Sequence, residues 1–182
     1  MTRIAALLDR NEQFARTYEP VSLGLPTTRT IMVTCLDHRV DPAIVLGLRL
    51  GDAPVIRNAG GRVNQAVIDD IAYLAYLVRQ ISGGQAAPEA RAEVAVIHHT
   101  QCGMGLLADP AFRHGAAEAT HIAEAALEAA IVTNPHLTVR TDVDRLLSAP
   151  VLTGKVSVSG HVYDVATGRV TTIVDSRNPE DS

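Results

Sequence analysis

The segment Val94-Ala95-Val96-Ile97-His98-His99-Thr100-Gln101-Cys102-Gly103 decides the fold, because a continuous apolar run passes directly into two potential metal ligands. Its four leading apolar residues predict a strand that is buried on both faces, as in a parallel sheet. His99 and Cys102 are three residues apart, so one tight turn can bring an imidazole and a thiolate to one ion. Gly103 and Gly105 favour such a turn. This stretch therefore predicts half of a metal site at the end of a central strand.

Two further apolar runs show the same plan of a strand followed by polar residues. The run from Thr30 to Cys35 ends at the only other cysteine of the chain. The run Val55-Ile56-Arg57-Asn58 leads directly into Gly60 and Gly61. Because the loops after the carboxyl ends of parallel strands meet at one edge of a sheet, we expect these segments to converge on His99 and Cys102.

The alternation of strands and helices predicts an α/β protein with a central, mostly parallel sheet flanked by helices. Residues 1–27 are expected to form an N-terminal amphipathic helix, within residues 4–19, and a tether with prolines and a glycine. Further helices are predicted from Asp41-Pro42 through Leu48, from Asn64 to about Ile81 before Gly83-Gly84, from about Ala117 to Thr133 after a looser region, and through Val139 to Leu147. A C-terminal hairpin is predicted around residues 166–168. We expect residues 1–182 to form a single domain whose N-terminal helix packs on a dimer partner.

The composition excludes several classes of function. The chain has 182 residues, a net charge of −4 and only 3% aromatic residues, so nucleic-acid binding is not expected. No apolar run is long enough to span a membrane, and no signal peptide is apparent, so we expect a cytoplasmic protein that does not bind membranes. Two cysteines in such a protein are free thiols or metal ligands more often than a disulfide, and purely structural buried cysteines remain an alternative.

The residue types at the predicted site suit zinc. Two thiolates and one imidazole, from Cys35, Cys102 and His99, form a donor set that Zn²⁺ prefers. A structural zinc usually has four protein ligands, whereas a catalytic zinc keeps one position for water, so three ligands favour catalysis. Asp37 leaves two alternatives open. Its carboxylate could complete the shell as a fourth ligand, or, held by Arg39, it could accept the proton of a zinc-bound water.

The motifs together resemble the β-class carbonic anhydrases. The resemblance rests on Cys35-Leu36-Asp37-His38-Arg39, on His99-Thr100-Gln101-Cys102, on the segment Val55 to Gly61 between them, and on Gly160-His161-Val162-Tyr163-Asp164. It implies one zinc per chain on Cys35, His99 and Cys102, a catalytic Asp37–Arg39 pair, and a homodimer or higher homo-oligomer. It also implies that Asp37 can ligate zinc in a closed state.

The resemblance implies reversible hydration of carbon dioxide to bicarbonate and a proton by zinc-bound hydroxide. The backbone amides of Gly60 and Gly103 are candidate donors to the substrate. Two alternatives remain at this point: a carbonyl sulfide or carbon disulfide hydrolase with the same site, and a catalytically silent zinc-stabilised scaffold. His98 points away from His99 along the strand and is expected to be packed or hydrogen bonded instead of binding metal.

Overall fold

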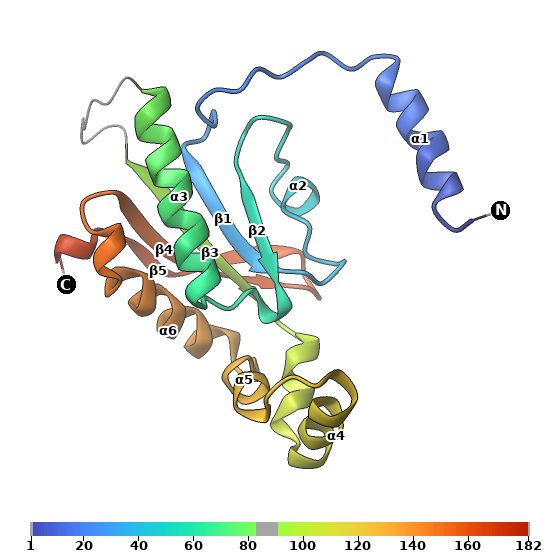
Figure 1. The fold of residues 1–182 in the computed structure, drawn as a ribbon, viewed down its shortest axis with the longest axis vertical. Coiled ribbons are helices and arrows are strands. Elements are labelled where there is room, and N and C mark those ends of the chain that lie inside the picture. The colour runs from blue at the N-terminus through green and yellow to red at the C-terminus, as the bar shows by residue number, and fades with distance from the viewer. Residues whose placement is uncertain (1, 83–90, 182) are drawn as a thin grey trace.

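The computed structural model describes residues 2–82 and 91–181, and its centre is a five-stranded sheet in the order β2-β1-β3-β4-β5 (Figure 1). The strands are β1 (Thr30–Cys35), β2 (Val55–Asn58), β3 (Ala92–His99), β4 (Val156–Asp164) and β5 (Arg169–Arg177). β2, β1, β3 and β4 pair in parallel, and β5 is antiparallel to β4. The predicted mostly parallel sheet and C-terminal hairpin are therefore confirmed.

Besides the strands, the described part of the chain contains six α-helices and four short 3-10 helices. They are α1 (Ala5–Ala15), α2 (Pro42–Val45), η1 (Ala59–Gly61), α3 (Gln65–Ile81), η3 (Gly103–Ala108), α4 (Pro110–Thr120), α5 (Glu124–Ala129), α6 (Pro135–Leu147), η4 (Pro150–Leu152) and η5 (Pro179–Asp181). α3 and α6 cover one face of the sheet (Figure 1), where Ile71 and Val143 join Val33, Val96 and Val158 in the main core. A smaller apolar cluster lies on the opposite face.

Side-chain caps fix the first residues of α3 and α2, where the sequence predicts these helices to begin. The Asn64 side chain accepts a hydrogen bond from the amide of Val67 at the start of α3, as its type and position suggest. Asp41 caps α2, with Pro42 in the first turn, but α2 ends at Val45 and does not continue through Leu48 as predicted. Gly47 has a φ of 67°, a left-handed conformation that stops the helix. The predicted end of α3 at Gly83-Gly84 lies outside the described residues.

The prediction for the region after Cys102 is wrong. Instead of a loose segment and one helix over residues 117–133, the chain forms η3, α4 and α5. α4 begins early because the Asp109 side chain accepts a hydrogen bond from the amide of Phe112 and Pro110 occupies the first turn. It ends at His121, whose φ of 58° breaks the alanine-rich run into two helices. Helix propensity alone indicated a helix here but not its limits.

The N-terminal part extends away from the sheet. α1 has no buried residue and stands apart from the body of the protein (Figure 1), while the segment after it leads back to β1. That segment lines an apolar cavity of about 890 Å³ at the amino ends of β1 and β3, together with residues such as Leu50 and Leu77. The cavity is at the opposite end of the sheet from His99 and Cys102. Across the described residues, every helix is too short or too polar to cross a membrane.

Candidate metal centre

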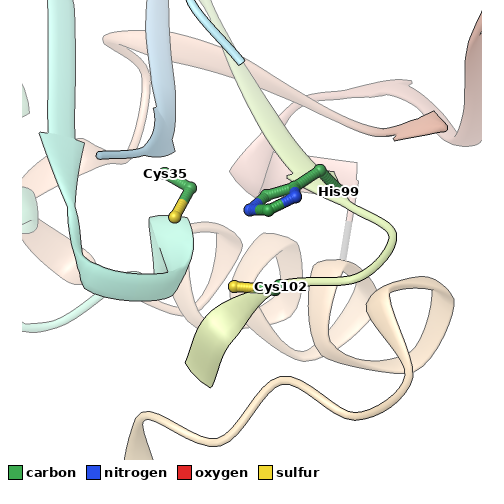
Figure 2. Close-up of side chains that lie close together, drawn as sticks. All are labelled: Cys35, His99 and Cys102. Atoms are coloured by element: carbon green, nitrogen blue, oxygen red, sulfur yellow. The ribbon is translucent and has the colours of Figure 1, made fainter. Parts of the chain in front are cut away.

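The strand pairing brings the three predicted ligands together. β1 and β3 are adjacent and parallel, with Thr34 opposite Ile97, so Cys35 and His99 emerge at the same edge of the sheet. Cys102 follows after a short turn, and the ligand atoms of Cys35, His99 and Cys102 lie within 4.8 Å of one another. Figure 2 shows both sulfurs and the imidazole directed toward a common centre. This cluster is what the sequence predicts from the carboxyl-end rule for parallel strands.

The imidazole of His99 is oriented for metal binding. Its Nδ1 atom lies 2.9 Å from the carbonyl oxygen of Thr100, to which it can donate a hydrogen bond. That bond places the proton on Nδ1 and leaves a lone pair on Nε2. Nε2 is buried and has no hydrogen-bond partner in the protein. A buried nitrogen without a partner is costly in an isolated protein and is satisfied when it binds a metal ion.

The turn between His99 and Cys102 depends on a residue other than the two glycines from which it was predicted. Gln101 adopts a φ of 55°, whereas Gly103 and Gly105, the expected turn glycines, do not have a positive φ. Gly105 is instead required for close packing, because a Cβ atom there would lie 3.1 Å from the carbonyl oxygen of Val132. The left-handed residue aims the Cys102 sulfur back toward His99.

The thiols of Cys35 and Cys102 interact strongly with each other. A hydrogen bond from Cys102 lowers the pKa of Cys35 to about 4, against the opposing effect of burial, and His99 and the amides of Asp37 and Gly60 assist. The same contact with Cys35, together with burial, raises the pKa of Cys102 well above its ordinary value. Both sulfurs bind a metal ion as thiolates, so metal binding at this site is linked to loss of the thiol protons.

The donor set fits zinc. Cys35 and His99 are buried, Cys102 is nearly so, and two thiolates with one imidazole match the soft-to-borderline donors that Zn²⁺ prefers. Asp37 is not a member of the cluster in which all ligand atoms lie within 4.8 Å. Among the described residues, the centre therefore has three close protein donors, and these can form a metal site.

Asp37 and Arg39 form a closed pair beside the cluster. The Nε and Nη2 atoms of Arg39 donate to the two carboxylate oxygens at 3.0 and 2.7 Å, and the Arg39 amide donates to Oδ1 at 2.9 Å. Nη2 also donates to the carbonyl oxygen of Gln101, which links the pair to the turn that carries Cys102. These bonds to Arg39 hold the pKa of Asp37 well below its usual range. Asp37 is thus ionised at neutral pH and can only accept hydrogen bonds.

A second arginine, Arg57, holds the loop after β1 in place. Its guanidinium donates to the carbonyl oxygens of Cys35 and Asp37 at 3.0 and 2.8 Å, and its Nη1 atom lies 3.1 Å from Asp41. The sequence showed Arg57 at the end of a strand but gave no indication of these partners. Its hydrogen bonds fix the backbone on both sides of the first ligand.

The two glycines of η1 support Cys35 from behind. Gly61 has a φ of 66°, and a Cβ atom there would lie 2.9 Å from the backbone nitrogen of Cys35. The amide of Gly60 faces the Cys35 sulfur and helps to stabilise its thiolate. Gly60 is therefore placed to support a ligand, whereas Gly103 has open space around its Cα atom. A side chain at Gly61 would displace the strand end that carries Cys35.

Comparisons with known proteins agree with this geometry. The sequence profile of the carbonic anhydrase family matches residues 30–170. The chain is 31% identical over 145 residues to β-carbonic anhydrase 1 of Mycobacterium tuberculosis, a match that covers 80% of this chain and 82% of that protein. The crystal structure of a carbonic anhydrase from Streptococcus mutans superposes with a TM-score of 0.73 at 31% identity, over 95% of this chain and 98% of the other.

One further similarity is restricted to part of the chain. The protein is 39% identical over 82 residues to a carbon disulfide hydrolase of Saccharolobus solfataricus, which is 44% of this chain and 35% of that protein. The carbonic anhydrase matches extend over most of the chain, on a fold of the same topology and with a cluster suited to zinc. On this combined evidence, the chain belongs to the β-carbonic anhydrase family.

Proposed function

We propose that this protein catalyses the reversible hydration of carbon dioxide to bicarbonate and a proton. One observation carries the proposal: the carboxylate of Asp37 is bound by Arg39 and stands outside the cluster of Cys35, His99 and Cys102. Three protein ligands with a free fourth position are the arrangement of a catalytic zinc. CO₂ hydration is also the activity of the family to which the chain belongs.

The residues of the chain have separate roles in this proposal. Zinc, when bound by Cys35, His99 and Cys102, would supply a Lewis acid that acidifies water for attack on the carbon of CO₂. Asp37 accepts a hydrogen bond from the reacting water at a carboxylate oxygen and so orients it. Arg39 keeps that carboxylate ionised and fixed in direction. The amide of Gly103 remains our candidate donor to the oxygens of the substrate.

A catalytically silent scaffold fits the site less well. Such a protein would need Asp37 as a fourth ligand that keeps water from the metal. Both carboxylate oxygens of Asp37 are instead engaged by Arg39, which in turn holds the Gln101 carbonyl. The pair would have to separate before Asp37 could bind the metal.

Hydrolysis of carbon disulfide or carbonyl sulfide is a second candidate function. The partial similarity to a carbon disulfide hydrolase favours it, and these linear molecules can be attacked by the same activated water. Parallel assays with CO₂, carbonyl sulfide and carbon disulfide separate the two candidates. A specificity constant for either sulfur compound well above that for CO₂ would replace our proposal with this one.

The decisive test combines metal content with CO₂ hydration on one purified sample. We expect one zinc per chain and stopped-flow activity that rises between pH about 6.5 and 9, because two thiolates make a zinc-bound water harder to ionise than three histidines do. One zinc per chain without hydration at any pH would overturn the proposed activity while leaving the metal site intact.

We propose further that the protein is a single-domain subunit of a cytoplasmic homodimer or higher homo-oligomer. α1 has no buried residue and stands apart from the sheet, as expected of a helix that packs on a second copy. The apolar side chains Leu7 and Phe14 of α1 are also exposed, at about half of their surface. Tyr73 and Tyr76 on α3 are exposed as well. A second copy would cover these surfaces.

A further inference from the structure

A cluster of charged and polar side chains, centred on the buried residues His98 and Asp142, lies on the face of the sheet behind the metal centre. Arg62 donates from Nε and Nη2 to the carboxylate of Asp142, at 2.7 and 3.3 Å. The Nε2 atom of His98 lies 3.1 Å from the same carboxylate without forming a regular hydrogen bond. His98 Nδ1 lies 2.7 Å from the hydroxyl oxygen of Thr138. The side chains of His98 and Asp142 are at most 1% exposed.

Two members of this cluster, His98 and Arg62, belong to segments that carry or support a metal ligand. His98 precedes the ligand His99 on β3, and Arg62 follows η1, whose Gly61 packs on the backbone of Cys35. Asp142 and Thr138 belong to α6. The cluster therefore joins β3, η1 and α6 through polar contacts around the buried carboxylate of Asp142.

Arg62 also holds the chain between α5 and α6. Its Nη1 atom donates to the carbonyl oxygens of Ala129 and Ile131, at 3.0 and 2.9 Å. Val132, the next residue, is buried in one apolar cluster with Cys35 and Cys102. Its side chain and carbonyl oxygen approach Gly60 of η1 and Gly105 of η3 closely. The segment 129–132 thus lies between the two short helices beside the cysteines.

Stability alone does not explain such a cluster. Buried ion pairs often contribute little to the free energy of folding, because desolvation of the two charges offsets their attraction, and apolar side chains of similar size would serve as well. Burial by itself would raise the pKa of Asp142, but His98 and Arg62 outweigh it and the pKa lies below its usual value. The carboxylate is therefore charged, and its two hydrogen bonds from Arg62 are directional.

We infer that Asp142, held between Arg62 and His98, is a positioning residue that sets the geometry of the three zinc ligands. It does so by tying the segment 129–132 and the end of β3 to α6. This inference rests on the metal site of the proposed function and not on its substrate. Outer residues that orient a metal site typically change the metal affinity about 10- to 100-fold when they are replaced.

The test is the zinc affinity of the variant Asp142→Asn, which keeps the size of the side chain and removes its charge. We expect competition with a chromophoric chelator to show a loss of about tenfold or more. The visible absorption spectrum of the cobalt-substituted protein should also shift, because its bands report the arrangement of ligands around the ion. Arg62→Lys is the second variant, because lysine keeps the charge but cannot bind the carboxylate and two carbonyl oxygens together.

Asp52→Asn is the matched control. Asp52 is also buried and hydrogen bonded, to the Thr27 hydroxyl at 2.6 Å and the Arg49 amide at 2.8 Å, but it precedes β2 at the opposite end of the sheet. We expect it to leave zinc affinity and the cobalt spectrum unchanged, whatever it does to stability. An equal loss of affinity in Asp52→Asn would overturn the inference.

The remaining outcomes are also distinct. If Asp142→Asn does not fold, the zinc affinity and cobalt spectrum of Arg62→Lys test the inference in its place. Folded variants that match the wild type in zinc affinity and cobalt spectrum would overturn this inference alone. A wild-type protein that binds no zinc would overturn the proposed function and this inference with it.

Discussion

Asp37 and Asp142 are each hydrogen bonded to an arginine, but they differ in their exposure to solvent and in their proposed roles. Asp37 faces the metal centre and retains 14% of its side-chain exposure, whereas Asp142 retains 1%. Both are held ionised, and both have pKa values below the usual range. Only Asp37 can reach a water molecule at the open side of the centre. Both carboxylates are therefore ionised, but only Asp37 is accessible to solvent. This difference in exposure gives the two residues different roles.

Replacement of Asp37 tests its role in catalysis. We expect Asp37→Ala to retain one zinc per chain but to lose about 10²- to 10⁴-fold in CO₂ hydration at neutral pH, because the reacting water loses its acceptor. Zinc analysis and stopped-flow assays on the same sample measure both properties. Asp69→Ala, which removes an exposed carboxylate of α3, is the control and should retain full activity. Full activity of Asp37→Ala would remove Asp37 from the mechanism.

The residues of the site differ in how far they could be predicted. The spacing of His99 and Cys102, and their position after a strand, indicated the ligands because the chemistry requires those residue types close together. Arg62 and Asp142 are 80 residues apart, and neither belongs to a local pattern. Their pairing depends on how α6 packs on the sheet. A long-range contact between two charged residues leaves no signal in a single sequence.

Among the elements, η1 is the one on which the first ligand depends most directly. Gly61→Ala introduces a Cβ atom 2.9 Å from the Cys35 backbone and forces a positive φ on alanine. We expect a loss of unfolding free energy above about 2 kcal/mol, measured by urea denaturation, and weaker zinc binding. The loss should be present in both zinc-free and zinc-loaded protein.

Gly168→Ala provides the matched control for this variant. Gly168 has a φ of 72° in the β4–β5 turn, with no atom within 4 Å of an added Cβ. We expect Gly168→Ala to lower the unfolding free energy by roughly 1 kcal/mol, the strain of a left-handed alanine, and to leave zinc binding unchanged. Equal effects of the two substitutions would show that contact with the Cys35 backbone is not important.

The strands were predicted better than the helices for a physical reason. β1 and β3 are buried, so continuous apolar runs mark them even without their neighbours. The region of α4 and α5 is alanine-rich, and both a single helix and two shorter ones agree with that composition. The left-handed turn at His121 decides between them, and it depends on the packing of α4 against its surroundings.

For the molecule as a whole, Asp142 should influence stability in acid. Its pKa is lower in the folded protein than in the unfolded chain, where it is about 3.9. Its stabilising effect is therefore present above pH about 4 and is lost as the pH falls through the folded value. We expect the unfolding free energy of zinc-free wild type to decrease more steeply below pH about 4 than that of Asp142→Asn. Urea denaturation at a series of pH values measures both slopes, and identical slopes would contradict the prediction.

The proposed oligomer predicts a specific effect of α1. Because α1 has no buried residue, deletion of residues 1–15 should leave the fold of the sheet intact, as seen by circular dichroism, and weaken self-association, as seen by sedimentation. Leu8→Asp should have the same effect on association, because it places a charge on the apolar side of α1. Gln13→Asp, at an exposed polar position of the same helix, should not. Unchanged association after the deletion would place the interface elsewhere.

The adjacency of β1 and β3 gives zinc a consequence beyond catalysis. Cys35 and His99 follow neighbouring strands but are distant along the chain, so an ion bound to both joins them as a cross-link would. Closing a loop of about 65 residues costs about 4 kcal/mol of chain entropy in the unfolded state. Loss of zinc should therefore shorten the lifetime of the folded protein, in addition to abolishing its activity. A cell short of zinc would hold less of this protein, and not only a less active form of it.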